Sequence, residues 1–205
     1  INVLAFALAL ALTKGIKGTN IFRTIFFMPN LIGGVVLGYV WKTLINCFLS
    51  IIGQPLLALN STAGYWGLII LMCWQQIGYM MIVYIAGLQS VPDSVLEAAE
   101  IDGANAWKTL FKVKIPMVMS SVTVCLFLTL SNSFKLFDQN LALTNGQPYG
   151  KGKMTEMLAL NIFETFYGRS GWEGVGQAKA VIFFIIVAII ALAQNRITRA
   201  KEVQQ

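Results

Sequence analysis

The sequence predicts an all-α protein that crosses a membrane several times. Of its 205 residues, 57% are hydrophobic and only 12% are charged, whereas soluble proteins carry about 25% charged residues. The mean hydropathy is +0.69, and long apolar stretches recur along the chain. A soluble fold of this size would need a far larger polar surface, so we expect a polytopic helical bundle.

Five apolar segments form the predicted membrane-embedded part of the chain. The first, residues 1–13, is too short to cross a bilayer core of about 30 Å. We therefore expect it to be the end of a longer helix, and the chain to be N-terminally incomplete. The other four segments are residues 22–46, 65–88, 117–143 and 175–193. Pro29 and the pair Gly33–Gly34 interrupt the second segment, which a membrane tolerates only where neighbours or a cavity satisfy the backbone.

The positions of lysine and arginine predict which connections face the cytoplasm. Three basic residues and no acidic one lie between residues 14 and 23, and three more basic residues end the chain. The connection over residues 47–64 carries no charge, whereas residues 89–116 contain three lysines. Because Lys and Arg are enriched on the cytoplasmic side, we expect the first connection, residues 89–116 and the tail to be cytoplasmic. Lys151 and Lys153 oppose this pattern, but they lie in a longer connection, where the rule weakens.

The composition also excludes several kinds of chemistry. The chain has no histidine, which removes His-based acid–base catalysis and the commonest transition-metal ligand. Its three cysteines show neither zinc-site nor disulfide spacing. The net charge of +6 comes from basic residues that flank apolar runs and are not interleaved with aromatic residues. We therefore predict no catalytic residue, no metal site and no nucleic-acid partner.

The most informative stretch is the predicted cytoplasmic segment over residues 90–116. Ser90 is expected to cap a first helix, and Pro92 to lie in its first turn. Gly103 then allows a turn with positive φ, and a second short helix runs up to Pro116. The residues alone leave two readings open, a coupling element or a surface loop with two amphipathic helices that bind nothing.

The spacing within this segment resembles the EAA loop of ABC importer permeases. The matching elements are Glu97-Ala98-Ala99, Asp102-Gly103 and Ile115-Pro116. Residues 22–29, 87–92, 136–138 and 143–148 are similar to MalF-type permeases of carbohydrate importers, with Gln147 where that family usually has a second glycine. The resemblance implies a MalF/MetI-like bundle, with residues 1–205 as a single permease domain in the plasma or inner membrane.

The resemblance also implies a coupling mechanism and a set of partners. The segment would dock in a groove of a cytoplasmic ATPase, with Glu97 meeting a basic residue, Ala98 and Ala99 allowing close approach, and Gly103 shaping the turn; Asp102 and Pro116 complete the motif. The implied partners are a second, MalG-like permease, two ATPase copies, an extracytoplasmic solute-binding protein and the sugar. ATP and Mg would bind the ATPase, because residues 146–151 lack Walker A spacing and its Ser or Thr.

Polar residues inside the apolar segments are candidates for the solute path, because unpaired polar groups are costly in lipid. Comparison with maltose-type permeases selects Asn30, Gln76, Tyr79, Thr129 and Ser133. Lys135 and Asp138 lie three residues apart, so one helix would place them on one side as a gate or a pair. The alternative for each of these residues is hydrogen bonding between helices.

Two other functions are weighed against sugar import. One is an ABC importer for a different solute, such as a polyol, a glycerol phosphodiester or a peptide. The other is a secondary transporter driven by an ion gradient, which predicts acidic residues within spans and internal repeats. Asp138 is the only acidic residue well inside an apolar stretch, and no repeat is found.

Overall fold

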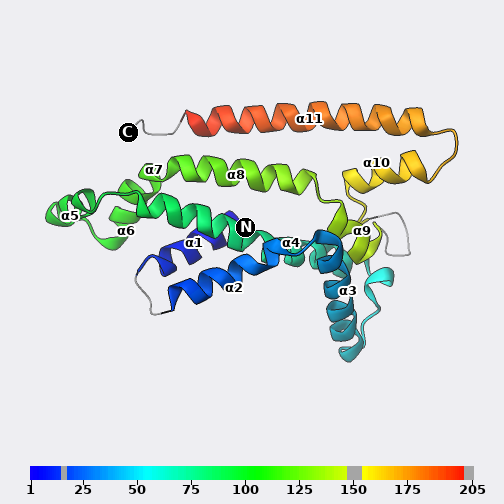
Figure 1. Cartoon of the computed structure of the whole chain (residues 1–205), viewed down its shortest axis with the longest axis horizontal. Helices are drawn as coiled ribbons and strands as arrows, with labels where there is room; N and C mark the ends of the chain where they lie inside the picture. Colours follow the sequence, from blue (N-terminus) through cyan, green and yellow to red (C-terminus); the bar gives the residue numbers. More distant parts are fainter. Residues whose placement is uncertain (15–17, 147–153, 201–205) are drawn as a thin grey trace. The chain divides into compact units, whose positions relative to one another are not determined.

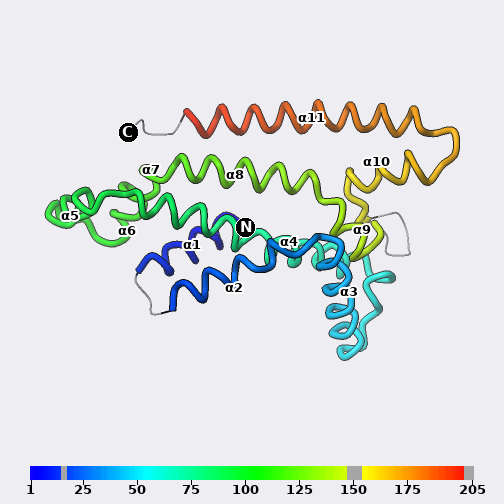
Figure 2. The backbone as a smooth tube through the Cα atoms, in the orientation of Figure 1, coloured from blue at the N-terminus to red at the C-terminus, as the bar shows by residue number. Residues whose placement is uncertain are grey.

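The computed structural model describes residues 1–14, 18–146 and 154–200, and these ranges contain helices and no strand (Figure 1). The predicted all-α class is confirmed. Figure 2 traces the same backbone. The expectations for Lys151, Lys153 and the stretch that follows Gly146 fall outside the described residues.

Most elements are α-helices, with one short 3-10 helix and one short π-helix. They are α1 (Asn2–Leu12), α2 (Thr19–Leu31), α3 (Gly34–Ile51), η1 (Leu57–Leu59), α4 (Ser61–Gln89), α5 (Asp93–Ile101), α6 (Ala106–Thr109), η2 (Leu110–Lys114), α7 (Ile115–Met117), α8 (Met119–Phe134), α9 (Asp138–Thr144), α10 (Leu158–Tyr167) and α11 (Glu173–Arg199).

Within the described residues, three helices are long and apolar enough to cross a membrane: α3, α4 and α11. The last two correspond to the predicted segments 65–88 and 175–193. A fourth span would combine α8 with the helical stretch Ala106–Met117, and the chain bends by 70° between them. Helix α1 has 11 residues, in agreement with a first segment too short to span alone.

Two of the predicted apolar segments are broken. The segment 22–46 divides into α2 and α3, with Ile32 and Gly33 between them, so the interruption predicted at Gly33–Gly34 is confirmed, whereas Pro29 lies inside α2 and does not end it. The segment 117–143 divides into α8, which ends at Phe134, and α9, which begins at Asp138. Between α8 and α9 the amide of Phe137 donates to the carbonyl of Lys135 at 2.8 Å, a tight turn that replaces the helical pattern.

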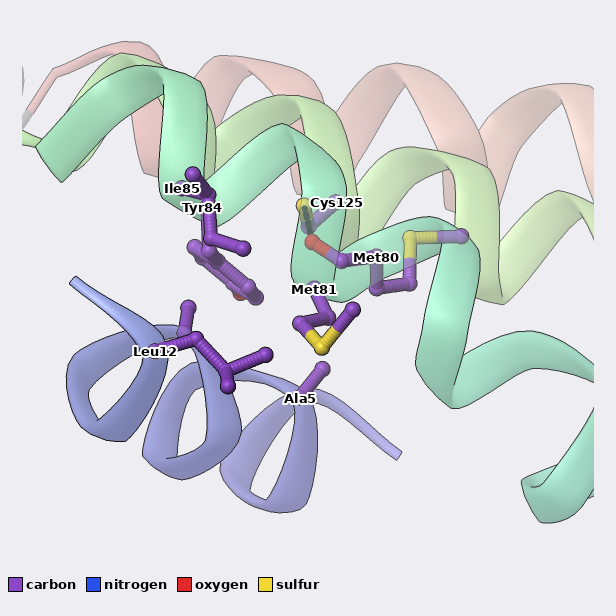
Figure 3. Packing of buried hydrophobic residues seen from close by; sticks show 8 residues of the cluster. Ala5, Leu12, Met80, Met81, Tyr84, Ile85 and Cys125 are labelled. Carbon is purple, nitrogen blue, oxygen red and sulfur yellow. Dashed lines mark hydrogen bonds between the residues drawn. The ribbon is translucent and has the colours of Figure 1, made fainter. Parts of the chain in front are cut away.

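The backbone forms two compact units. One comprises Ile1–Pro29, Gln76–Leu130 and Ile190–Gln205. Its core joins α1, α4 and α8 through Ala5, Ala9, Leu12, Met80, Met81, Tyr84, Ile85 and Cys125. In Figure 3, Ala5 and Leu12 of α1 face Met81 and Tyr84 of α4. Unbranched methionine side chains fill irregular gaps of this kind between helices.

The other unit comprises Asn30–Gln75 and Ser131–Ile189. Its core contains Leu49, Leu57, Leu68, Leu71 and Leu143. Helix α3 packs against α9, and a Cβ added at Gly38 would collide with the side chain of Ala142. Small residues four apart let membrane helices approach closely, and Gly34 and Gly38 provide this spacing.

Gly78 provides the closest backbone contact in the first unit. A Cβ at this position of α4 would overlap the carbonyl of Phe26 in α2. We expect Gly78→Ala to separate these helices and to destabilise the protein by about 1–3 kcal/mol. Thermal unfolding in detergent measures the effect, with Gly174→Ala in α11 as the matched control, because nothing lies within 4 Å of that site. Equal stability of the two variants would contradict the close packing.

Candidate functional site: the helical segment 90–116 and polar clusters of the spans

The first helix of the segment 90–116, α5, begins without a side-chain cap. Its N-cap residue is Pro92, in extended conformation, and Asp93 lies in its first turn, where a negative charge favours the helix dipole. The prediction that Ser90 caps this helix is wrong. The Ser90 hydroxyl instead donates to the carbonyl of Gly87 at 2.7 Å, so it satisfies the end of α4.

Gly103 ends α5 in a left-handed turn. Its φ is +71°, as predicted from the lack of a side chain. The amide of Ala104 donates to Ala99 O at 2.9 Å, and the amide of Gly103 donates to Glu100 O at 3.0 Å. These two bonds form a Schellman motif, which closes the helix end and fixes the direction of the following chain.

The second half of the segment is a distorted helix. The side chain of Asn105 accepts a hydrogen bond from the amide of Lys108 at 2.9 Å and so caps α6. The helix continues through the π-helical stretch η2 and through α7, which contains Pro116. Proline has no N–H to donate to the preceding turn, and π-helical turns accommodate such irregularities. The 70° bend follows immediately, before α8.

The surface of this segment combines acidic and large apolar side chains. Glu97 is exposed, and the side chains of Ile101, Trp107 and Phe111 are 86%, 69% and 59% exposed. The rings of Trp107 and Phe111 stack at 5.9 Å between centroids. Exposed apolar residues grouped beside a charge mark a surface that contacts another molecule. Ile101 was missed in the sequence analysis, although an apolar residue next to the terminating Asp-Gly pair is a usable signal.

The other residues of the predicted motif also lie on accessible backbone. Ala98, Asp102 and Gly103 are exposed, whereas Ala99 and Pro116 are partly buried. The small side chains of Ala98 and Ala99 lie next to Glu97 on α5. Glu97, Ala98 and Ala99 therefore lie on α5, Asp102 and Gly103 lie in the turn that ends it, and Pro116 lies apart in α7.

The predicted solute-path residues are distributed over both units. Gln76, Tyr79 and Thr129 belong to the first unit, and Asn30 and Ser133 belong to the second. Gln76 is buried and Tyr79 is partly buried, with its ring 6.4 Å from that of Phe27. The structure therefore does not gather all five in one unit.

Thr129 takes part in a hydrogen-bonded network between three helices. Its hydroxyl accepts from Asn2 Nδ2 at 3.1 Å and donates to the carbonyl of Cys125 at 2.7 Å. The hydroxyl of Tyr84 donates to Asn2 Oδ1 at 3.0 Å. These contacts favour interhelical bonding over solute contact for Thr129. Asn2 and Tyr84 were missed, although an asparagine within the apolar run 1–13 is a visible signal.

A second polar group lies at the interruption between α2 and α3. The side-chain amide of Gln139 donates to Gln75 Oε1 at 2.8 Å, and Gln75 Nε2 lies 3.5 Å from the carbonyl of Ile32. Gln75 is 7% exposed. Buried backbone polar groups at a break need such partners, so the two glutamines stabilise the interruption.

Asn140 performs the corresponding task for the stretch before α10. It is fully buried, donates to Thr155 O at 2.7 Å and accepts from the amide of Met157 at 3.0 Å. These two bonds attach the backbone of residues 155–157 to α9. A buried primary amide that pairs with both a carbonyl and an N–H leaves few polar groups unsatisfied.

The positions of Lys135 and Asp138 correct one prediction. Lys135 lies in the turn after α8, and Asp138 is the first residue of α9, so no single helix carries both. Both side chains are exposed, and the structure, which describes both residues, contains no ion pair between them. The premise of a common helix is wrong because the α8–α9 turn rotates the backbone between the two positions.

A polar cavity of about 340 Å³ lies between α10 and the start of α11. Lys179 of α11 donates to Asn161 Oδ1 and to Thr165 Oγ1, each at 2.8 Å. Asn161 Nδ2 in turn donates to Glu156 Oε1 at 3.0 Å. Partnering of this kind is what allows a lysine to lie within an apolar helix. Lys179 therefore fastens α10 to α11 and was not predicted.

Comparison with known proteins gives consistent matches over almost the entire chain. Residues 1–202 match the family model described as "Binding-protein-dependent transport system inner membrane component". The probable starch degradation products transport system permease protein AmyD of Thermoanaerobacterium thermosulfurigenes is 45% identical over 213 residues, covering 100% of this chain and 71% of that protein. The multiple sugar-binding transport system permease protein MsmF of Streptococcus mutans is 30% identical, covering 98% and 71%.

A solved structure has a similar fold. It is a bacterial ABC transporter involved in the import of the acidic polysaccharide alginate, and a chain of it superposes with a TM-score of 0.81. The match covers 96% of this chain and 72% of that chain, at 20% sequence identity. At this identity the likeness establishes the fold.

The hydrogen bond between Asn2 and Thr129 predicts a measurable coupling energy between these two residues. We expect Asn2→Leu and Thr129→Val to be coupled by about 0.6 kcal/mol in a double-mutant cycle of unfolding in detergent, the average for hydrogen bonds between membrane helices. Thr24→Val is the matched control, because the Thr24 hydroxyl bonds only to its own helix, at Asn20 O. A coupling energy of zero between residues 2 and 129 would contradict a structural role for this bond.

Proposed function

The chain belongs to the family of binding-protein-dependent transport system inner membrane components and is a permease subunit of a carbohydrate ABC importer; we propose that its solute is an oligosaccharide released from starch. The observation that carries this proposal is the 45% identity, over the full chain, to a permease named for starch degradation products. Permeases named for α-glucosides and for trehalose and maltose, at 30% and 27% identity, support the same class of solute.

The transport cycle proposed for this subunit needs partners on both sides of the membrane. A solute-binding protein delivers the sugar from outside, as the family description implies. A second, MalG-like permease completes the pathway, and two copies of a cytoplasmic ATPase bind ATP and Mg. This chain is a transport subunit and not an enzyme, so hydrolysis takes place on the separate ATPase.

The cytoplasmic segment is the proposed contact with the ATPase. Glu97 pairs with a basic residue of the groove, while Ala98 and Ala99 permit close approach. The exposed apolar side chains around Trp107 support this role, because they would be buried by a docked partner. The Schellman turn at Gly103 and the helical stretch Ala106–Met117 join α5 to α8 across the 70° bend, and this connection supports transmission of a displacement to α8.

Polar residues in the spans are the proposed solute contacts. Gln76 is 8% exposed and lies in the middle of α4, and its side-chain amide carries both donors and an acceptor that suit sugar hydroxyl groups. Tyr79 follows one turn later and offers a ring for stacking on a sugar. Asn30 and Ser133 are further candidates.

The family assignment removes one of the two competing functions and leaves the other to experiment. Membership of an ABC permease family removes the ion-driven secondary transporter. An importer for a polyol, a glycerol phosphodiester or a peptide is distinguished by the solute that the partner binding protein carries, which the first experiment below identifies.

The assembly can be tested by gentle purification of the tagged full-length chain followed by mass spectrometry. We expect one further permease, one ATPase and a solute-binding protein that binds starch-derived oligosaccharides. Recovery of the chain alone or as a homo-oligomer in several mild detergents would contradict the proposed assembly. A co-purified binding protein specific for a peptide or a glycerol phosphodiester would contradict the sugar.

The coupling role of Glu97 can be tested by charge reversal. We expect Glu97→Lys to lower ATP-dependent sugar uptake by at least about tenfold, because it places two positive charges in a desolvated contact. Glu100→Lys is the matched control on the same helix, since Glu100 is also exposed and lies outside the motif. Both variants should reach the membrane in equal amounts by immunoblot. Equal uptake by the two variants would remove Glu97 from the proposed contact.

A further inference from the structure

A cavity also lies in the first unit, between α8 and the last two turns of α11. Its volume is about 420 Å³. Val124, Phe127 and Leu128 provide its apolar lining, and its polar lining consists of Ser120, Thr123, Asn195 and Arg199. The hydroxyl of Thr123 donates to the carbonyl of Met119 in its own helix at 3.1 Å. None of the residues discussed for coupling or solute transport contributes to it.

The polar and apolar residues of this cavity are separated along the helices. Ser120 lies at the start of α8, two residues after the bend at Val118, and Arg199 is the last residue of α11. Both positions lie next to connections that are predicted to be cytoplasmic from the distribution of Lys and Arg. Phe127 lies seven residues further into α8, about 10 Å deeper at 1.5 Å per residue. The cavity is therefore polar and cationic at the membrane border and apolar towards the bilayer core.

This gradient matches one class of molecule. We propose that the cavity binds an anionic phospholipid, with the phosphate against Arg199, Ser120 and Asn195 and one acyl chain along Val124, Phe127 and Leu128. Basic pockets between membrane helices on the cytoplasmic side have the chemistry that anionic head groups require. The inference does not depend on the identity of the transported sugar.

Other occupants fit this lining less well. A sugar would leave its hydroxyl groups without partners along the apolar wall. Inorganic phosphate would fill only the polar end. A helix of a partner protein would have to leave the Arg199 guanidinium against apolar side chains or supply an acid for it. No acidic residue is among the described residues that line the cavity.

A bound lipid would also explain how α11 is held. The side chains of this helix are largely exposed along its length, including Phe184, Ile189 and Leu192. An acyl chain between α8 and α11 would supply apolar contacts that the protein itself does not make at this end. We therefore expect the lipid to stabilise the attachment of α11 to the first unit.

The test is native mass spectrometry of the full-length permease in mild detergent, titrated with phosphatidylglycerol or with phosphatidylcholine. We expect a retained phosphatidylglycerol, and about fivefold weaker retention in Arg199→Gln, the loss that corresponds to one basic residue near a membrane surface. Arg196→Gln is the matched control, because it removes the same charge one turn earlier at a residue that does not line the cavity. It should retain the lipid nearly as well as the unchanged protein.

A second variant separates the apolar from the polar contribution. Val124→Trp fills the apolar part without changing charge, and it should also weaken phosphatidylglycerol retention. Three results would overturn the proposal: equal loss in Arg196→Gln and Arg199→Gln, which indicates diffuse surface charge; equal retention of phosphatidylcholine; or full competition by inorganic phosphate. Thermal unfolding of each variant without added lipid identifies a misfolded variant. Asn195→Leu, which changes another polar residue of the lining, then replaces that variant in the titration.

Discussion

The requirement that backbone polar groups be satisfied inside the membrane is the constraint on which this structure depends. Side-chain amides meet it at one interruption, between α2 and α3, and at the stretch that leads into α10. Gln75 and Gln139 satisfy the break after α2, and Asn140 satisfies the backbone that leads into α10. Close packing of α3 on α9, which Gly38 permits, brings these amides within reach. Without them the carbonyls of Ile32 and Thr155 and the amide of Met157 would lose these partners.

Hydropathy predicts where apolar helices lie in the sequence, but it does not predict where the backbone leaves the helix within an apolar stretch. The segments 65–88 and 175–193 become single helices because nothing in them breaks the helical pattern. The turn between α8 and α9 was not predicted, because Leu136 and Phe137 keep the stretch apolar while the backbone leaves the helix. Gly103 was predicted correctly, since a glycine that follows a helix and precedes a polar turn points to a positive φ.

The candidate site was predictable where it depends on local sequence, and not where it depends on contacts distant in the chain. The proposed coupling motif lies within residues 90–116, and all its residues except Pro116 lie on α5 or in the turn that follows it, so they could be named in advance. Thr129 is different, because its partner Asn2 is 127 positions away and no local pattern pairs them. The same holds for Lys179, whose partners come from α10. Ser90 shows another limit. Serine is a common N-cap residue, but here its hydroxyl bonds to the end of α4 and not to the start of α5.

The central claim is that this chain passes a sugar across the membrane when a separate ATPase hydrolyses ATP. The most direct test is uptake of radiolabelled maltotriose by proteoliposomes that contain the complete transporter and its binding protein. The account predicts uptake that requires ATP on the ATPase side and that persists when ionophores dissipate the ion gradients. Uptake that continues without ATP and collapses with the ionophores would contradict it.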